Sequence, residues 1–390
     1  MSITFSFGTY RTTYKDTHHK EALNYALDNG ITDIDTASNY MNGEAETLIG
    51  KAIENRKRED ITIVSKGGYI YGDDLQKIAD GKMVDDLVIY NETCFHSIDP
   101  IFLKGQIENS IKRMNSSYID IYLLHNPEYY LMQNIHFDSS EDEIKQHREI
   151  MQSRIKKAFE FLESEVKKGT IKGYGISSDS FAKSSDNIHF LDYTHLIEYA
   201  KEFGGEDHGF KVIQFPMNPF EVEGEAAGIW AKQNGIEVQI NRPLNAISGE
   251  EMLRLASYES CKEFDALVEQ MKTIPDSEMQ KLLGLILDAK HNFAWAGQVD
   301  EHIDNETIPF IMNIVKVDQK YHELIYKFMR CYKQEVKHHL SKTTALRLHM
   351  EGSIDKQAIE FLKQKEYISK ILIGMRDKEY VDRVLYSYNM

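Results

Sequence analysis

The sequence predicts an α/β fold: a (β/α)8 TIM barrel in a single domain of residues 1–390, with long insertions in its βα loops. Eight short apolar runs alternate with helical patterns along the chain, and such alternation is typical of a parallel sheet. Eight strands favour a closed barrel over an open sheet. No GxGxxG follows the first strand, so the usual dinucleotide-binding fingerprint of an open sheet is missing.

Each predicted strand is a short run rich in β-branched and other apolar residues. We expect strands at residues 3–8, 31–35, 61–66, 119–125, 171–176, 212–214, 236–240 and 371–373. Apolar residues with helical spacing predict helices at residues 18–29, 44–54, 102–114, 148–168, 193–203, 224–234 and 378–385. Several of these helices end at a glycine, such as Gly30, Gly169 and Gly235, as helices commonly do.

Three segments are longer than a barrel requires: residues 67–99, 126–146 and 245–369. The first is rich in Gly and Asp, the second is polar and aromatic, and the third is mostly helical by pattern. Insertions in βα loops usually lie over the active-site face of a barrel. We expect them to serve packing, substrate choice or oligomerisation. Aromatic residues that could line a pocket there are Tyr69, Tyr71, Phe95, His96, Tyr129 and Tyr130.

The composition argues against several partners. The net charge is −16, whereas nucleic acids and anionic membranes select basic patches, so we expect neither as a partner. No stretch approaches the roughly 20 apolar residues of a membrane span, and the first residues do not resemble a signal peptide. The cysteines, Cys94, Cys261 and Cys331, are far apart and lack metal-ligand spacing. They indicate a reducing, cytoplasmic compartment and no metal site.

Four chemically useful residues fall at or just after the ends of predicted strands: Asp35, Tyr40, Lys66 and His125. The C-terminal ends of barrel strands open on one face, where catalytic groups collect. A carboxylate, a phenol, an amine and an imidazole on that face can transfer protons. Taken singly, each residue has an ordinary structural explanation, such as a helix cap or a solvated lysine. The prediction of a catalytic set depends on their joint occurrence.

Five collinear segments carry a resemblance to a known family. They are DTASNYMNGEAETLIG at 35–50, VSK at 64–66, DIYLLHNP at 120–127, GTIKGYGIS at 169–177 and IGMR at 373–376. Together they resemble motifs of the aldo-keto reductase superfamily. The resemblance extends over nearly the whole chain except the three insertions. The chain is also similar to a branch of that family with long loops that contain HNPEY and NRPLN, which stand here at 125–129 and 241–245.

The resemblance implies an oxidoreductase that reduces an aldehyde or ketone with NADP(H), or oxidises the matching alcohol. The nicotinamide would supply the hydride, and the protein would supply the proton and orient both partners. Tyr40 would be the proton donor. Lys66 would lower its pKa from the usual value of about 10, while Asp35 would hold Lys66 in place. His125 would hydrogen-bond the carbonyl oxygen and help to donate the proton.

The resemblance also implies a cofactor site at the strand ends, for NADP(H) rather than NAD(H). Ser178 departs from the family, which often has Asn there. Asn241 stands where many members have an aromatic residue that stacks on the nicotinamide, and Arg242 stands where they have a serine. Arg376 would meet the adenosine phosphates. The implied cofactor-binding residues are Gly8, Thr9, Tyr10, Asp35, Ser177, Ser178, Gln214, Asn241, Arg242, Pro243, Leu244, Gly374, Met375 and Arg376.

Two other functions stay open. Residues 33–36 loosely fit the DxDxT start of haloacid-dehalogenase phosphatases, although Ala37 departs from that pattern. Alternatively, the barrel could bind NADP(H) as a regulatory or sensor module with little turnover, since residues 241–242 are altered and the largest insertion is helical. If the protein is a reductase, we expect a small carbonyl or alcohol substrate. The sequence predicts neither its identity, nor the oligomeric state, nor the physiological direction.

Overall fold

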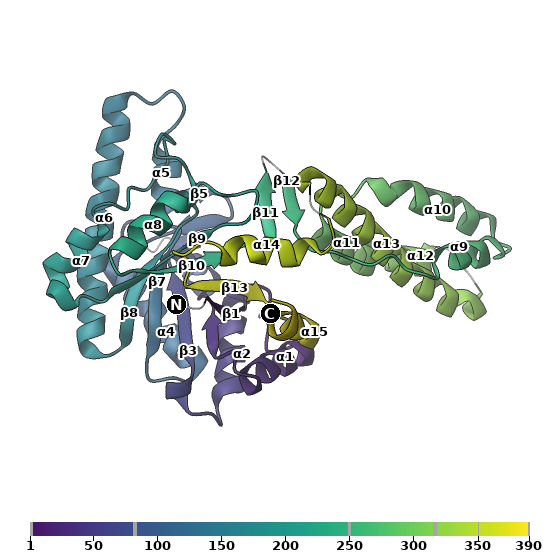
Figure 1. Cartoon of the computed structure of the whole chain (residues 1–390), viewed down its shortest axis with the longest axis horizontal. Coiled ribbons are helices and arrows are strands. Elements are labelled where there is room, and N and C mark those ends of the chain that lie inside the picture. Colours follow the sequence, from purple (N-terminus) through teal and green to yellow (C-terminus); the bar gives the residue numbers. More distant parts are fainter. Residues whose placement is uncertain (1–2, 81–83, 249–250, 315–317, 350, 389–390) are drawn as a thin grey trace. The chain divides into compact units, whose positions relative to one another are not determined.

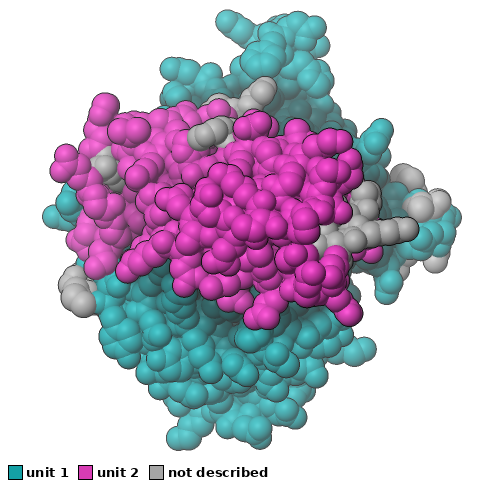
Figure 2. Space-filling model, turned by 90° about the vertical axis from the view of Figure 1, so that its right-hand side faces the viewer, with its two compact units in different colours: residues 1–217, 222–243, 362–390 teal, residues 218–221, 244–361 magenta. Residues whose placement is uncertain are grey.

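The computed structural model describes residues 3–80, 84–248, 251–314, 318–349 and 351–388. Residues 1–217, 222–243 and 362–390 form one compact unit, and residues 218–221 and 244–361 form another. Figure 2 colours the two units teal and magenta. We call them the barrel unit and the helical unit. The helical unit coincides closely with the largest insertion predicted from the sequence, residues 245–369.

Eight parallel strands close the barrel unit in the order β1-β13-β10-β9-β8-β7-β3-β2 (Figure 1). Their bounds are β1 (Thr4–Gly8), β2 (Asp33–Asp35), β3 (Thr62–Gly67), β7 (Ile119–His125), β8 (Ile171–Ser177), β9 (Phe210–Pro216), β10 (Glu237–Asn241) and β13 (Lys370–Gly374). The first and last strands close the ring, with Gly8 level with Gly374. The predicted closed barrel and all of its eight strands are therefore confirmed.

Apolar side chains on both faces of the strands hold the barrel together. Phe7, Ile34 and Leu124 are fully buried on the strands. Outside the barrel wall, Phe159 packs against Tyr174 and Phe210, with ring centroids 4.9 and 5.1 Å away. Burial of such a side chain contributes about 1.5–3 kcal/mol. This packing keeps the strands in register, so that their C-terminal ends form one rim.

Helices follow the barrel strands in sequence. They are α1 (Thr17–Asp28), α2 (Glu44–Ile53), α4 (Pro100–Met114), α6 (Glu141–Lys168), α7 (Leu196–Gly204), α8 (Glu225–Gln233) and α15 (Lys378–Asp382). Helix α14 (Ile354–Lys363), which precedes β13, belongs mostly to the helical unit. Helix α6 begins seven residues before the predicted start. Ser140 and Glu143 form a reciprocal capping box there, which satisfies two otherwise free backbone donors and extends the helix. It ends, as predicted, at Gly169, whose φ is 76°.

The two shorter insertions contain structure that the sequence did not predict. The segment after β3 forms an antiparallel sheet of β4 (Tyr69–Ile70), β5 (Val88–Asn91) and β6 (Cys94–His96), together with α3 (Gly72–Ala79). The segment after β7 contains α5 (Tyr129–Asn134). Gly68 has a φ of 143°, and a Cβ there would lie 2.5 Å from His96 Nε2. A glycine is therefore required where this sheet meets the barrel.

The helical unit confirms the mostly helical pattern of the largest insertion. Its hairpin consists of β11 (Asn245–Ser248) and β12 (Glu251–Arg254), and its helices are α9 (Phe264–Lys272), α10 (Ser277–Asp288), α11 (Ala296–His302), α12 (Ile308–Ile314) and α13 (His322–Leu348). Met271, Leu283, Val299 and Phe328 are among the buried residues of its own apolar core. None of the helices within the described ranges is both long and apolar enough to cross a membrane.

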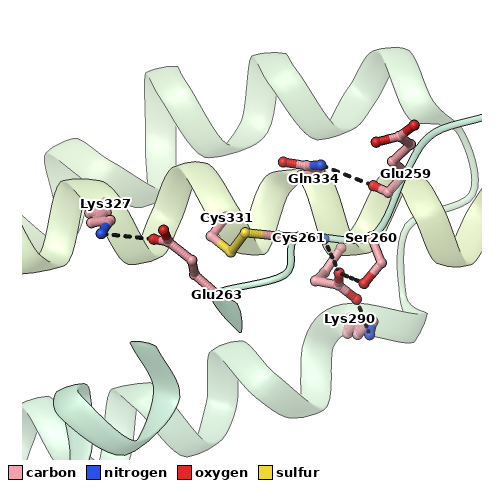
Figure 3. The surroundings of a disulfide bond; sticks show 9 residues. Glu259, Ser260, Cys261, Glu263, Lys290, Lys327, Cys331 and Gln334 are labelled. Atoms are coloured by element: carbon pink, nitrogen blue, oxygen red, sulfur yellow. Dashed lines mark hydrogen bonds and ion pairs between the residues drawn. A yellow bond between two sulfur atoms is a disulfide. The ribbon is translucent and has the colours of Figure 1, made fainter. Parts of the chain in front are cut away.

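A disulfide between Cys261 and Cys331 joins the segment before α9 to helix α13 (Figure 3). Next to it, Glu335 accepts hydrogen bonds from the Ser260 hydroxyl and the Cys261 amide. The expectation of reduced cysteines is therefore not met for this pair, whereas Cys94 is free. The two residues are separated by 70 positions in sequence. Helix packing brings them together, and spacing alone gives no sign of it.

Candidate functional site

The rim of the barrel brings the four predicted catalytic residues together. Asp35, Lys66 and His125 lie at the C-terminal ends of β2, β3 and β7, and Tyr40 lies in the turn after β2. Lys66 Nζ is 2.6 Å from Asp35 Oδ1 and 3.4 Å from the Tyr40 hydroxyl. The rings of Tyr40 and His125 meet edge to face, with centroids 5.9 Å apart. The four side chains thus form one continuous cluster.

Asp35 and Lys66 form a buried ion pair. Lys66 is fully buried, and its ammonium also donates to the carbonyl of Thr36 at 2.8 Å. The second carboxylate oxygen of Asp35 accepts a hydrogen bond from Gln214 Nε2 at 2.8 Å. Burial raises the pKa of Asp35 and lowers the pKa of Lys66, whereas their mutual contact opposes both shifts. Since both oxygens of Asp35 accept hydrogen bonds, we assign it as a carboxylate.

Tyr40 is held by an unusual turn. Met41 and Asn42 follow it with left-handed φ values of 49° and 55°, which few residues adopt without support from their surroundings. Burial, and then the charge of Asp35, raise the pKa of Tyr40 well above its ordinary value of about 10. The expected lowering of this pKa is therefore not met in this structure, where the pKa of Tyr40 is raised instead. The phenol keeps its proton, which is the form that a proton donor requires.

His125 is a neutral imidazole. Burial, followed by the charge of Lys66, lowers its pKa well below the ordinary value. Its Nδ1 is buried without a hydrogen-bond partner among the described residues. A neutral imidazole carries one N–H, so it can donate a single hydrogen bond. Of the two acidic groups proposed from the sequence, Tyr40 is thus the better source of a proton, and His125 is suited to orienting an oxygen atom.

Residues of the two shorter insertions surround His125. The Tyr69 ring contacts the His125 ring edge to face at 4.8 Å, and its hydroxyl donates to the hydroxyl of Tyr129 at 3.1 Å. His96 Nε2 lies 2.7 Å from the backbone carbonyl of His125. Tyr69, His96 and Tyr129 therefore lie together beside His125. Tyr130 instead lies against other residues, with its hydroxyl 3.0 Å from His147 Nδ1.

The residues at the end of β1 line the same rim. Gly8 pairs with Asp35 of β2, and a Cβ on Gly8 would crowd the backbone of β13. Thr9 is buried, and its amide and hydroxyl both donate to the carbonyl of Asp35, at 3.0 and 2.9 Å. Tyr10 is largely exposed and touches the edge of the Tyr40 ring at 5.2 Å. Tyr10 is thus the most exposed of the three residues.

The ends of β8 and β9 place Ser177, Ser178 and Gln214 next to the ion pair. The Ser177 hydroxyl donates to Gln214 Oε1 at 2.9 Å, and the Ser178 amide donates to the Gln214 carbonyl at 2.9 Å. Gln239 accepts from Gln214 Nε2 at 3.2 Å. Gln239 was missed in the sequence, although a glutamine between Val238 and Ile240 in an apolar strand is itself a signal of a polar site.

The end of β10 presents Asn241, Arg242 and Pro243. Asn241 Oδ1 is buried and has no hydrogen-bond partner among the described residues. Arg242 has a left-handed φ of 50°, and its guanidinium donates to Asp179 at 3.1 Å. Pro243 is buried on the same turn. Leu244, which directly follows Pro243, is buried and is the first residue of the helical unit's main segment.

The end of β13 presents Gly374, Met375 and Arg376. Gly374 is exposed, and a Cβ there would meet open space. Met375 is fully buried. Arg376 is partly buried and forms no hydrogen bond or ion pair with any residue that the structure describes. It therefore keeps its charge available to an anionic group.

The DxDxT-like segment does not form one site. Asp33 lies at the start of β2 and forms an ion pair with Lys370 at 2.6 Å, at the start of β13. Asp35 lies at the other end of β2, where it binds Lys66. The two carboxylates therefore serve opposite ends of the strand, which argues against the phosphatase alternative.

Sequence reasoning also missed Asn126, Glu128 and Asp179. Asn126 has a left-handed φ of 53°, and Glu128 is almost completely buried. The only signal for them was their position: two lie in the HNPEY segment directly after His125, and Asp179 follows the Ser177-Ser178 pair. Acidic residues in loops are usually exposed, so the burial of Glu128 could not be predicted.

The structure thus combines a closed parallel barrel with a cluster of acid-base side chains on the rim formed by its strand ends. The chain belongs to the aldo/keto reductase family, whose model matches residues 4–245. That match ends where the helical insertion begins. Strand β13 and Arg376 lie beyond it.

Two curated relatives are similar to part of the chain. Aldo-keto reductase YhdN of Bacillus subtilis (strain 168) is 34% identical over 109 residues, 28% of each chain. The NADH-specific methylglyoxal reductase of Escherichia coli (strain K12) is 27% identical over 99 residues, 25% of this chain and 27% of that protein. The chain thus matches less than a third of the length of these relatives.

A solved structure supports the fold over nearly the whole chain. The aldo-keto reductase AKR11C1 from Bacillus halodurans (holo form) superposes with a TM-score of 0.52 and 15% identity, covering 99% of this chain and 86% of that chain. At this identity the likeness concerns the fold alone.

Proposed function

We propose that this protein is an NADP(H)-dependent oxidoreductase that reduces an aldehyde or ketone, or oxidises the matching alcohol. Membership of the aldo/keto reductase family implies nicotinamide-dependent carbonyl chemistry. The observation that carries the proposal is the position of Lys66, between the Asp35 carboxylate at 2.6 Å and the Tyr40 hydroxyl at 3.4 Å. A phenol with an ammonium at its oxygen is suited to proton transfer.

The side chains divide the work of reduction. The bound nicotinamide would supply the hydride to the carbonyl carbon. Tyr40 donates its proton to the carbonyl oxygen, and Lys66 stabilises the phenolate that remains. His125, as a neutral imidazole, donates a hydrogen bond to the same oxygen and orients it. Asp35 keeps Lys66 charged and in place. In the oxidation direction the same groups act in reverse, and the phenolate accepts the proton.

The residues at the strand ends fit a nicotinamide dinucleotide. Asn241 Oδ1 is buried and unpartnered among the described residues, so it has an acceptor to offer to a bound group. Ser177 and Gln214 would hold the carboxamide. Arg376, without an ion pair among the described residues, would hold the phosphates and favour NADP(H) over NAD(H) through the 2′-phosphate. One relative is NADH-specific by name, so the preference has to be measured.

The first test is titration of the purified protein with NADPH and NADH, followed through quenching of intrinsic fluorescence. Micromolar binding of NADPH, followed by turnover in a panel of aldehydes and ketones, supports the proposal. Tight binding without turnover favours a regulatory NADP(H)-binding barrel instead. If neither nucleotide binds, the reductase function is wrong.

We also propose that the protein is cytoplasmic. The Cys261–Cys331 disulfide is an observation against it, because disulfides are rare where thiols are kept reduced. Cell fractionation combined with thiol labelling decides the question. Recovery in the cytosolic fraction with both thiols labelled would support a cytoplasmic protein that is reduced there.

A further inference from the structure

Glu128 places a buried carboxylate between two loops of the rim. It is only 2% exposed. Its Oε1 accepts hydrogen bonds from Asn126 Nδ2 at 2.9 Å and from the amides of Asp179 and Ser180, at 2.8 and 3.3 Å. Its Oε2 is buried with no hydrogen-bond partner among the described residues. A single oxygen atom thus ties the loop after β7 to the loop after β8.

The contacts on the first side lead to His125. Asn126 Nδ2 donates to Glu128, and its Oδ1 lies 3.4 Å from the Tyr69 hydroxyl, whose proton goes to Tyr129. Tyr69 contacts the His125 ring at 4.8 Å. Asn126 also has a left-handed φ of 53°, a conformation that needs support from its surroundings. Glu128 therefore supports the backbone turn immediately after His125.

The contacts on the second side lead to the proposed nicotinamide site. Asp179 and Ser180, whose amides donate to Glu128, directly follow Ser177 and Ser178. The Asp179 carboxylate in turn accepts from Arg242 at the end of β10. Three strand ends, those of β7, β8 and β10, are thereby linked through one buried carboxylate.

We infer that Glu128 is a positioning residue, which holds the loop of His125 at a fixed distance from the loop that would bind the nicotinamide carboxamide. The inference rests on the proposed function. Hydride transfer needs the carbonyl and the nicotinamide in close register, and a misplacement of about 1 Å can cost about 100-fold in rate. Glu128 acts through its hydrogen bonds with Asn126 and with the amides of Asp179 and Ser180.

The charge environment fits a positioning role. Burial, and then the nearby charge of Asp179, raise the pKa of Glu128, whereas the hydrogen bond from Asn126 lowers it. A buried carboxylate is costly unless hydrogen bonds compensate it. Glu128 has those bonds on one oxygen only. A glutamine offers the same acceptor oxygen without the charge, so it should preserve the two-loop link.

The test compares three variants with the wild-type protein. Glu128→Ala removes the link, and Glu128→Gln keeps its acceptor. Glu163→Ala is the matched control: Glu163 is equally buried and accepts from the Gly209 amide at 2.9 Å, before the start of β9 and far from the rim. The measurements are thermal stability, kcat and KM, the primary isotope effect with 4-deuterated NADPH, and hydrogen exchange of the Asp179 and Ser180 amides.

We expect Glu128→Ala to lower kcat by about 10- to 100-fold and to enlarge the isotope effect, because hydride transfer becomes slower relative to product release. The Asp179 and Ser180 amides should exchange faster, and Glu128→Gln should restore most of the rate. Glu163→Ala should lose stability without any change in the isotope effect.

Two results would overturn the inference. If Glu128→Ala behaves like Glu163→Ala, with lower stability but unchanged kcat, isotope effect and amide exchange, then Glu128 is purely structural. If the wild-type protein neither binds nor turns over NADPH, the proposed function itself fails, and there is no reaction for Glu128 to position. The wild-type measurement separates these two outcomes.

Discussion

Lys66 and Asp35 form an ion pair inside the barrel, with Nζ and Oδ1 2.6 Å apart and the lysine fully buried. The pair links the neighbouring strands β2 and β3. Lys66 also hydrogen-bonds the Tyr40 hydroxyl, and Asp35 accepts a hydrogen bond from Gln214. Burying two charges is expensive unless their geometry is good and further hydrogen bonds satisfy them. Replacing a buried ion pair by well-packed apolar residues is often neutral or stabilising, so this pair is better explained by its chemistry than by stability.

Tyr40→Phe should abolish most of the carbonyl reduction. Only the hydroxyl is lost, so we expect a fall in kcat of about 100-fold or more, with NADPH binding nearly unchanged. Steady-state kinetics and a fluorescence titration measure the two quantities. The matched control is Tyr25→Phe on α1, where the hydroxyl donates to Asp382 at 2.9 Å. Unchanged turnover in Tyr40→Phe would remove Tyr40 from the mechanism.

Lys66→Met should cost both activity and stability. It leaves the buried Asp35 without its counter-ion, which destabilises a fold by about 3–5 kcal/mol. Urea unfolding measures this loss. The double variant Asp35→Asn with Lys66→Met removes both charges, so it should recover stability but not activity. If Lys66→Met alone keeps the wild-type rate and pH dependence, Lys66 and Tyr40 are not coupled.

The rate of reduction should depend little on pH. Because burial raises the pKa of Tyr40, the protonated donor persists, and kcat should stay level from about pH 6 to about pH 9. Alcohol oxidation needs the deprotonated form, so its rate should rise across that range. Profiles of kcat in both directions measure this. A fall in reduction near neutral pH would mean that Lys66 outweighs burial in the working enzyme.

Arg376→Ala should weaken the binding of NADPH more than that of NADH. Arg376 has no ion pair among the described residues, so its removal costs little else. Titration with both nucleotides gives the ratio of dissociation constants. Lys378→Ala is the control, since Lys378 is nearby and already pairs with Glu21 at 3.3 Å. Equal weakening of the two nucleotides would mean that Arg376 does not recognise the 2′-phosphate.

The Cys261–Cys331 disulfide should stabilise the helical unit. It closes a long loop, across 70 positions, and such a cross-link contributes about 2–4 kcal/mol. Hydrogen exchange of α9 and α13 with and without reductant should reveal the loss. The double variant Cys261→Ser with Cys331→Ser should match the reduced protein, and Cys94→Ser should match the wild type. Identical exchange under both conditions would show that the bond contributes nothing.

The alternation of apolar runs and helical patterns was sufficient to predict the barrel, because strand and helix periods are local properties of the chain. The rule that strand ends share one face then placed Asp35, Lys66 and His125 on a common rim. The same rule included Tyr40, which follows the second strand, and the family resemblance added the cofactor residues. The local sequence could predict these site residues because each of them ends a strand or follows one.

Only the tertiary structure revealed how Glu128, Gln239 and Cys331 are used. Their partners lie 52, 25 and 70 positions away in sequence, and no local pattern records a contact over such distances. The net pKa shift of Tyr40 was also decided by the fold, because burial depends on every neighbour that excludes water. The sequence by itself determined which groups stand on the rim; packing decided which of them are charged, which are buried, and what holds them in place.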